Sequence, residues 1–200
     1  MKVYISADIE GITGTTHGDE TEKSKSDYEE FRDQMTAEVV AACEGALSAG
    51  ATEVWVKDAH WTGRNIMASK LPQEVKLVRG WSGHPFSMVQ ELDETFQALV
   101  LIGYHSRAGS DANPLSHTMS GSIAYVKINE HLASEMLLHA YAAALVKVPL
   151  VFVAGDAGLC QDAQALNPNI GTVAVKQGVG NSTVSIHPQL AVDQIRAGVQ

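Results

Sequence analysis

Short apolar, β-branched runs alternate along the chain with longer segments in which apolar residues recur every three or four positions. The short runs predict strands, and the longer segments predict amphipathic helices. The expected strands cover residues 3–7, 53–57, 74–79, 98–103, 122–128, 149–154 and 172–176. The expected helices run from a cap at Ser26 or Asp27 to Gly50, over residues 134–146, and over residues 191–197.

The repeated strand–helix–strand units indicate the fold class. Parallel strands need crossover connections, which helices usually provide. The run at residues 98–103 is apolar throughout, which is typical of a strand covered on both faces. The sequence therefore predicts an α/β fold, a mostly parallel sheet with helices on both faces. Residues 122–128 alternate in polarity, so we expect a half-buried strand there, closed by a turn at Asn129 and Glu130.

The composition is that of one ordinary globular domain, and we expect a single domain over residues 1–200. Hydrophobic residues make up 45% of the chain and charged residues 18%, which excludes disordered, collagen-like and coiled-coil classes. The formal net charge is −9, without a cluster of Lys and Arg. Nucleic-acid binding is therefore not expected. An acidic balance favours solubility, or carboxylates gathered around cations.

The sequence contains no segment typical of membrane insertion or export. Its longest apolar runs are far shorter than the roughly 18 residues that a membrane-spanning helix needs. The first predicted strand begins at Val3, with no signal peptide before it. We therefore expect no membrane association and a cytoplasmic location. Cys43 and Cys160 lie far apart in the sequence and are expected to be buried free thiols.

Acidic or imidazole side chains follow four of the predicted strands. Asp8 and Glu10 follow the first strand, His60 follows the second, His105 follows the fourth, and Asp156 follows the strand at 149–154. The carboxyl ends of parallel strands meet at one edge of a sheet, where α/β proteins form their sites. We therefore expect these side chains to lie together.

Carboxylates and imidazoles at one edge of a sheet predict a metal centre. Asp8 and Glu10 are expected to point the same way, because they alternate along an extended backbone. Two crowded carboxylates repel each other, and a divalent cation or a pair of them removes that cost. With His60 and His105, the donors suit zinc and two-metal hydrolases. The alternatives are a loop cap for the carboxylates, a surface role for His60 and a buried structural role for His105.

The sequence allows more than one role for several other polar residues. His117 lies in a loop and is a candidate acid/base or transition-state stabiliser, although a lone loop histidine is usually only solvated. Glu135 opens a helix, where acidic residues are common because of the helix dipole alone. Asp156 is interpreted first as a helix cap. His131, Glu135 and His139 have four-residue spacing, but His131 is expected to precede the helix, so this trio is a weak zinc candidate.

Several familiar enzyme motifs are absent. The sequence contains no GxGxxG after the first strand, no GxxxxGK[ST], no HExxH and no GxSxG. Nicotinamide-dependent, nucleotide-binding and serine-hydrolase classes therefore lose their main support. Residues 19–30, which are dense in charges and hydroxyls, are predicted to form a solvated lid or loop before the long helix.

Taken together, the motifs resemble those of a known family. Residues 6–11 (SADIEG) are similar to the SxDxEG opening of the zinc-dependent D-aminopeptidases, the DppA-like peptidases of family M55. The similarity continues in order and spacing to about residue 180. The further motifs are DAH at 58–60, PFSMV at 85–89, GYHSRA at 103–108, SHTM at 116–119, INE at 128–130, Glu135 and VAGD at 153–156.

The resemblance implies a dinuclear zinc centre with two Zn²⁺ per chain. It implies short peptides with N-terminal D-residues as substrates, and assembly into a ring-shaped homo-decamer. Chains of this family usually continue through a further C-terminal segment, which this sequence lacks after Gln200, so we expect oligomer contacts or part of the substrate pocket to be absent or contributed differently. The implied site residues are the bridging Asp8, Glu10 and His60 on one ion, His105 and Glu135 on the other, and the catalytic His117.

The expected activity is therefore release of N-terminal D-amino acids from short peptides, such as D-Ala-D-Ala, by a metal-dependent hydrolase. A dinuclear phosphoesterase is the alternative enzyme, because the same ligands can clamp a phosphate, although no Gly-rich phosphate cradle is present. The non-enzyme alternative is a metal-binding or peptide-binding protein. Five ligands spread over two ions leave coordination positions open, which favours catalysis.

Overall fold

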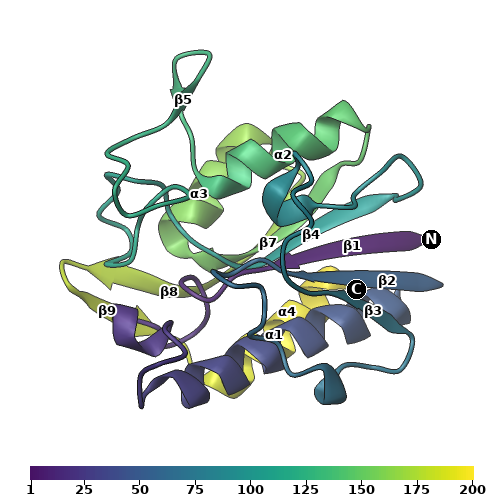
Figure 1. The fold of residues 1–200 in the computed structure, drawn as a ribbon, viewed down its shortest axis with the longest axis horizontal. Helices are drawn as coiled ribbons and strands as arrows, with labels where there is room; N and C mark the ends of the chain where they lie inside the picture. Colours follow the sequence, from purple (N-terminus) through teal and green to yellow (C-terminus); the bar gives the residue numbers. More distant parts are fainter.

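The computed structural model describes residues 1–200, and a seven-stranded sheet runs through its middle (Figure 1). The strand order is β3-β2-β1-β4-β7-β8-β9; β9 pairs antiparallel with β8, and the other pairs in this sheet are parallel. The predicted α/β fold with a mostly parallel sheet is thus confirmed. The strands are β1 (Lys2–Ala7), β2 (Glu53–Asp58), β3 (Val75–Val78), β4 (Ala98–Tyr104), β7 (Leu150–Asp156), β8 (Gly171–Val179) and β9 (Ser182–Ser185).

Helices cover both faces of this sheet, as predicted (Figure 1). One face is covered by α1 (Tyr28–Ser48) and α4 (Pro188–Val199), which pack on each other. The other face is covered by α2 (Glu135–Leu145) and α3 (Ala157–Leu166). No helix combines the length and the apolar character that crossing a membrane requires.

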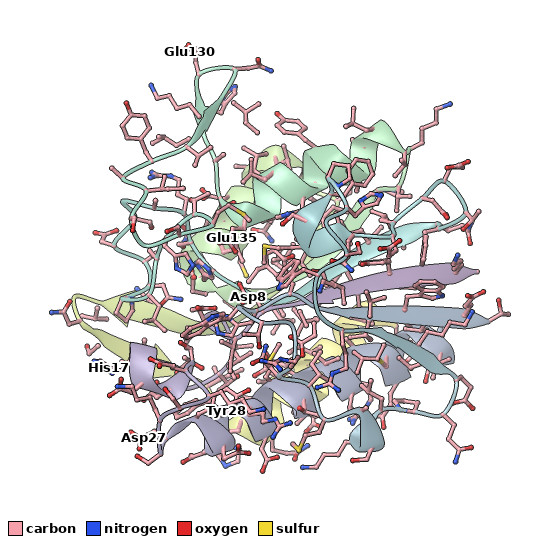
Figure 2. All side chains as sticks on the ribbon, viewed as in Figure 1. Asp8, His17, Asp27, Tyr28, Glu130 and Glu135 are labelled. Carbon is pink, nitrogen blue, oxygen red and sulfur yellow. The ribbon has the colours of Figure 1, made fainter.

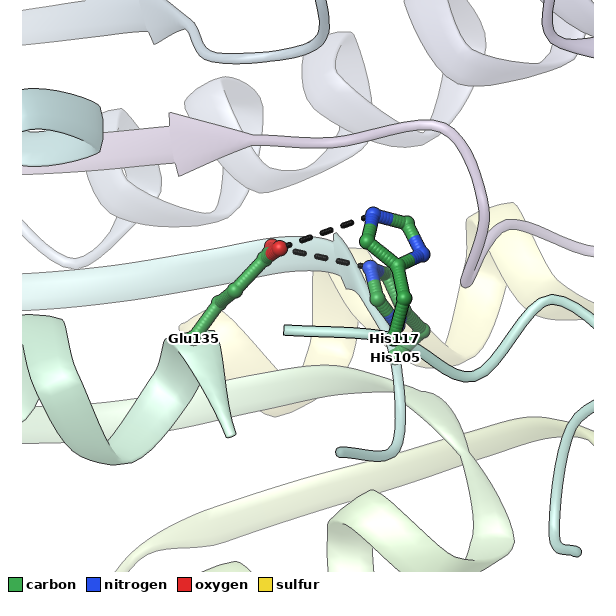
Figure 3. A group of neighbouring side chains, drawn as sticks. All are labelled: His105, His117 and Glu135. Carbon is green, nitrogen blue, oxygen red and sulfur yellow. Dashed lines mark ion pairs between the residues drawn. The ribbon is translucent and has the colours of Figure 1, made fainter. Parts of the chain in front are cut away.

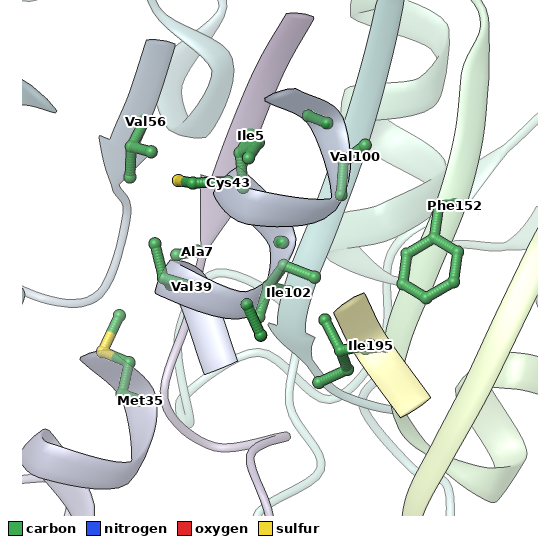
Figure 4. Packing of buried hydrophobic residues seen from close by; sticks show 14 of the residues in the cluster. Ile5, Ala7, Met35, Val39, Cys43, Val56, Val100, Ile102, Phe152 and Ile195 are labelled. Carbon is green, nitrogen blue, oxygen red and sulfur yellow. The ribbon is translucent and has the colours of Figure 1, made fainter. Parts of the chain in front are cut away.

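The side-chain alternation of the central strands divides the core into two clusters. Val3, Ile5 and Ala7 of β1 belong to the cluster that packs under α1 and α4 (Figure 4), whereas Tyr4 belongs to the cluster on the opposite face. All seven residues of β4 are buried. This explains why its sequence is apolar throughout, since both of its faces are covered.

The strand order of the sheet reverses at β1. From β1 the chain crosses through α1 to β2 and continues to β3, and it then returns to place β4 on the other side of β1. Ligand sites of open α/β sheets form where the strand order reverses in this way, beyond the carboxyl ends of the strands. The loops after β1 and β4 therefore flank the expected position of a site.

Gly11 allows the loop after β1 to lie directly against the end of β4. Its amide donates a hydrogen bond to the Gly103 carbonyl at 2.8 Å. A Cβ atom at position 11 would lie 1.8 Å from the carbonyl oxygen of Tyr104, far inside van der Waals contact. The glycine in the SADIEG segment is thus required by this close approach of two backbones.

We expect Gly11→Ala to lower the free energy of unfolding by about 3 kcal/mol or more, because the added methyl group forces two packed loops apart. Urea denaturation measures this change. Gly18→Ala is the matched control, because nothing lies within 4 Å of a Cβ atom built at Gly18; we expect it to change stability by less than about 0.5 kcal/mol. Equal stability of the two variants would contradict the packing argument.

The prediction of a half-buried strand over residues 122–128 is wrong. Only Lys127–Ile128 form a strand, β5, which pairs with β6 (His131–Leu132) in a hairpin that projects from the molecule (Figure 1). The apolar residues of the segment face outward, since Ile123 is 38% exposed and Tyr125 is 62% exposed. The seven-stranded sheet does not include this segment, and its only strand partner is β6. The expected turn is present, with positive φ angles at Asn129 and Glu130.

Other differences concern the C-terminal part of the chain. The strand predicted at residues 172–176 extends over Gly171–Val179, and its antiparallel partner β9 was not predicted. The last helix is longer than predicted, because it begins at Pro188, a residue suited to a first helical turn. Cys43 and Cys160 are free and buried, as predicted.

Candidate metal centre

The six candidate site residues are brought together by elements that are far apart in the sequence. Five of them, Asp8, Glu10, His60, His105 and Glu135, are buried, and His117 is partly exposed. In Figure 2, Asp8 and Glu135 lie near each other in the middle of the molecule, whereas Glu130 lies at the tip of the hairpin. Asp8, Glu10, His60 and His105 therefore gather at one edge of the sheet, as predicted, whereas Asp156 is not part of this group.

The loop after β1 differs from the extended backbone that we expected for Asp8 and Glu10. The strand ends at Ala7, and residues 9–13 form a bend and turns. Both carboxylates nevertheless face the same imidazole. Nδ1 of His60 lies 3.2 Å from Asp8 Oδ1 and 3.1 Å from Glu10 Oε2.

The other nitrogen of His60 identifies which ring atom is free to bind an ion. Nε2 lies 3.0 Å from the main-chain carbonyl of Thr21. Because a carbonyl oxygen only accepts hydrogen bonds, Nε2 carries a proton, and Nδ1, which faces the two carboxylates, is the ring atom left to bind an ion. Thr21 lies within the segment predicted to be a solvated lid, and it is buried. That segment therefore contributes a contact to the site.

His105 is held in a similar way on the other side of Asp8. Its Nδ1 donates to the main-chain carbonyl of Ser106 at 3.0 Å. Its Nε2 lies 3.6 Å from Asp8 Oδ2 and 3.5 Å from Glu135 Oε2. Asp8 thus presents one carboxylate oxygen to His60 and the other to His105.

His117 lies beside His105 and faces the same carboxylate (Figure 3). The two rings are 4.3 Å apart between centroids, and His117 Nε2 is 3.6 Å from Glu135 Oε1. Nδ1 of His117 donates to the Leu115 carbonyl at 2.8 Å. The side chain of His117 is 25% exposed, so His117 is the histidine at the outer side of the cluster.

Two residues not singled out by sequence reasoning fix the loop that carries His117. Thr118 Oγ1 donates to the Ala133 carbonyl at 2.9 Å and accepts the Ala108 amide at 3.0 Å. The Met119 amide donates to Glu135 Oε1 at 2.7 Å. Thr118 belongs to the SHTM segment, but no sequence pattern indicates that its hydroxyl connects this loop with the start of α2.

Burial and the attraction between opposite charges shift the pKa values of the cluster in opposite directions. Burial raises the pKa of Asp8 to about 8, and the charge of Glu10 adds to this effect. Burial also opposes ionisation of Glu10, but His60 outweighs it and holds the pKa of Glu10 well below its usual value. Burial opposes protonation of His105, yet Glu135 raises the pKa of His105 to about 10. The carboxylates therefore create a strong preference for positive charge between them.

The donor set fits divalent metal ions. Glu10 Oε2 and His105 Nε2 are buried atoms without a hydrogen-bond partner. Donors bound at 2.0–2.1 Å to one tetrahedral zinc ion lie about 3.3 Å apart, and the carboxylate–imidazole separations here run from 3.1 to 3.6 Å. Three imidazoles each donate one N–H to a main-chain carbonyl, an arrangement that orients metal-binding histidines.

The donor atoms form one continuous cluster rather than two separate sites. Asp8, Glu10 and His105 have ligand atoms within 4.8 Å of one another, and so do His105, His117 and Glu135. His105 belongs to both groups. The close contacts of His60 with Asp8 and Glu10 extend the cluster to the other side of Asp8. The cluster is therefore wide enough to offer donors to two ions.

The cluster opens into a cavity of about 590 Å³, a size typical of small-molecule sites. The floor is polar, and the walls carry apolar side chains that the sequence reasoning did not identify. Trp61 is 60% exposed and Trp81 is 44% exposed; the Trp81 indole donates to the Trp61 carbonyl at 2.7 Å. The lining residues are Asp8, Glu10, Ala59, His60, Trp61, Trp81, Met88, His117, Met119, Ser120, Gly121 and Glu135.

Asp156, His131 and His139 lie outside the cluster, as the sequence favoured. Asp156 caps α3, because its Oδ1 accepts the Leu159 amide at 2.9 Å. The trio of His131, Glu135 and His139 is not a site. His131 lies in the exposed hairpin strand β6, and His139 Nδ1 donates to the Glu135 carbonyl instead of approaching its carboxylate.

Comparison with known proteins assigns the chain to a family. The family model for M55 peptidases, described as D-aminopeptidase, matches residues 1–200. A D-aminopeptidase of Bacillus subtilis (strain 168) is 40% identical over 184 residues, which are 92% of this chain and 66% of that protein. The chain therefore spans slightly less than two thirds of the length of this relative.

A solved structure of a D-aminopeptidase also matches this chain. It is the Zn-dependent D-aminopeptidase DppA from Bacillus subtilis, described as a self-compartmentalizing protease. It superimposes with a TM-score of 0.93 at 35% identity, and the match covers 100% of this chain and 73% of that one. The fold, the sequence and the family model agree, and the chain belongs to the M55 peptidases, the D-aminopeptidase family.

Proposed function

We propose that this chain is a dinuclear zinc aminopeptidase that releases N-terminal D-amino acids from short peptides, such as D-Ala-D-Ala, in the cytoplasm. One observation carries the proposal: two carboxylate–imidazole groups share Asp8 at the floor of an open cavity. Structural metal sites are closed, whereas catalytic ones keep a position open to substrate. Membership of the D-aminopeptidase family supports the choice of a peptide as the substrate.

Five residues would hold two zinc ions per chain. Asp8 would contribute to both, together with Glu10 and His60 for one ion and with His105 and Glu135 for the other. This division follows the contacts of the two Asp8 oxygens with the two imidazoles. Zinc, when bound in such a pair, supplies Lewis-acid polarisation of a carbonyl group and lowers the pKa of a water molecule.

His117 acts through Nε2 in this proposal. Nδ1 is engaged with the Leu115 carbonyl, so Nε2 is the ring atom left for the reaction, and it lies near Glu135 at the edge of the cavity. From there it moves a proton to the leaving amine or donates a hydrogen bond to the tetrahedral oxyanion. The hydrogen bond to Leu115 fixes the ring plane during either step.

The walls of the cavity orient the peptide. Trp61, Trp81 and Met119 present apolar surface beside the polar floor. An apolar side chain of the substrate packs on this surface while the peptide carbonyl faces the carboxylates and imidazoles. Trp61 and Met119 have φ angles of 45° and 63°, an uncommon backbone conformation for residues other than glycine. The local backbone thus holds both side chains at the cavity.

We extend the proposal to assembly into a ring-shaped homo-decamer. The projecting hairpin, the loop before it and α2 support it, because all three carry exposed apolar side chains. Tyr125 is 62% exposed, Leu132 40%, Tyr141 39% and Leu145 78%. Such residues on adjacent elements are typical of interfaces between subunits. The matched structure is itself described as self-compartmentalizing.

Hydrolysis assays with the zinc-loaded protein test the proposed activity. D-Ala-D-Ala, L-Ala-L-Ala and a phosphomonoester are compared at equal concentrations. We expect cleavage of the D-dipeptide with kcat/KM at least about tenfold above that of the L-dipeptide, equivalent to about 1.4 kcal/mol of discrimination. Faster turnover of the phosphomonoester would support the phosphoesterase instead. Bound zinc without turnover of any of the three would support a non-catalytic binding protein.

A further inference from the structure

Lys176 of β8 is a buried lysine beneath the loop that carries Glu10. The residue is 3% exposed, and no carboxylate lies within ion-pair distance of its ammonium group. Burial of an ammonium group is costly unless polar partners compensate it. Here Nζ donates to two main-chain carbonyls, that of Glu10 at 2.6 Å and that of Thr15. Both carbonyls belong to the loop after β1.

Asn113 holds the same Glu10 carbonyl from a second direction. Its Nδ2 lies 3.1 Å from the Glu10 carbonyl and 3.2 Å from Asp156 Oδ2. The loop that contains Asn113 is fixed to β8, because the Gly178 amide donates to the Ala112 carbonyl at 2.8 Å. Two donors thus converge on the peptide group of a single candidate ligand.

These contacts continue to the other half of the metal centre. Asp156 Oδ2 accepts a hydrogen bond from the Ser106 amide at 2.7 Å, and Asp156 Oδ1 accepts one from the Ser106 hydroxyl at 2.5 Å. The carbonyl of Ser106 in turn accepts a hydrogen bond from Nδ1 of His105. Lys176, Asn113, Asp156 and Ser106 therefore form a polar frame that connects the peptide group of Glu10 with the ring of His105.

We propose that Lys176 is a positioning residue of the metal centre: with Asn113 it fixes the peptide group of Glu10 and so holds the Glu10 carboxylate against His60. The inference rests on the proposed function, because it takes Glu10 as a metal ligand. Lys176 itself does not line the cavity. Its effect is therefore exerted through Glu10, and its loss changes metal affinity before it changes any contact with a peptide.

Lys176→Met tests this role, because methionine keeps an unbranched side chain but removes the donor. Zinc affinity is measured by competition with a chromophoric chelator, and the cobalt(II)-substituted protein is examined by absorption spectroscopy. We expect zinc binding weaker by about 10- to 100-fold, the range found when outer partners of metal ligands are removed. We also expect an altered cobalt spectrum, because the Glu10 carboxylate shifts within the site.

Lys57→Met is the matched control. Lys57 is also a buried lysine and donates to a main-chain carbonyl, that of Gly80 at 2.5 Å, but it has no contact with Glu10. We expect it to lower thermal stability, as Lys176→Met does, and to leave zinc affinity within about threefold of the wild type. Equal weakening in both variants would show that general destabilisation is responsible and would overturn the inference.

Asn113→Ala provides a second route if Lys176→Met does not fold. It removes the other donor to the Glu10 carbonyl, and we expect weaker zinc binding in the same direction. Unchanged zinc affinity and an unchanged cobalt spectrum in a folded variant would overturn the positioning role while leaving the proposed function intact. A wild-type chain that takes up no zinc would instead overturn the proposed function, and this inference with it.

Discussion

Replacing Asp8 with alanine is expected to reduce peptide hydrolysis by at least about 10³-fold, since losing a Lewis acid removes several kcal/mol of transition-state stabilisation. Asp8 has the largest expected effect because its two oxygens face the two imidazoles, Oδ1 towards His60 and Oδ2 towards His105. The variant should lose donors to both ions at once. Hydrolysis of D-Ala-D-Ala and zinc content per chain measure the two consequences.

Asp27→Ala is the control for loss of an acidic side chain. Asp27 precedes α1, makes no cap hydrogen bond with its side chain, and lies far from Asp8 (Figure 2). This variant should retain its zinc and its activity. If Asp8→Ala kept its full zinc content and hydrolysed the dipeptide normally, Asp8 would not be the residue shared by the two ions.

His117→Ala is expected to lower kcat by about 10²- to 10⁴-fold, the usual contribution of a positioned proton-transfer group. Zinc content should stay unchanged, because the proposed ligands are the five buried residues and His117 is the partly exposed member of the cluster. The pair of measurements is steady-state kinetics on D-Ala-D-Ala and metal analysis of the same preparation.

His131→Ala is the control for His117→Ala, since His131 lies in the exposed hairpin and does not line the cavity. It should behave as the wild type. Full activity of His117→Ala with its zinc retained would exclude a catalytic role. Loss of zinc from His117→Ala would instead make His117 a ligand, in line with its closeness to His105 and Glu135.

The central strands could be predicted from the sequence because burial on both faces leaves few polar positions in them. β4 shows this most clearly, with all seven residues buried. Residues 122–128 alternate in polarity without forming a half-buried strand, because they belong to a projecting loop with exposed Ile123 and Tyr125. β9 has no clear sequence pattern, because it is a short edge strand of polar character whose only strand neighbour is β8.

The candidate site was predictable as far as topology determines it. Asp8, His60 and His105 follow parallel strands, and such strands end at one edge of the sheet. Glu135 could not be chosen by spacing, because an acidic residue in a first helical turn is favoured by the helix dipole alone; family resemblance supplied it. Lys176 gave no signal, because its contacts are with main-chain carbonyls that the sequence does not display.

The most direct test of the dinuclear metal centre is the zinc content of the purified chain, measured by elemental analysis after dialysis against metal-free buffer. The shared position of Asp8 between two imidazoles predicts about two zinc ions per chain. About one ion per chain would contradict the bridging role of Asp8. No retained zinc would contradict the assignment of Asp8, Glu10, His60, His105 and Glu135 as metal ligands.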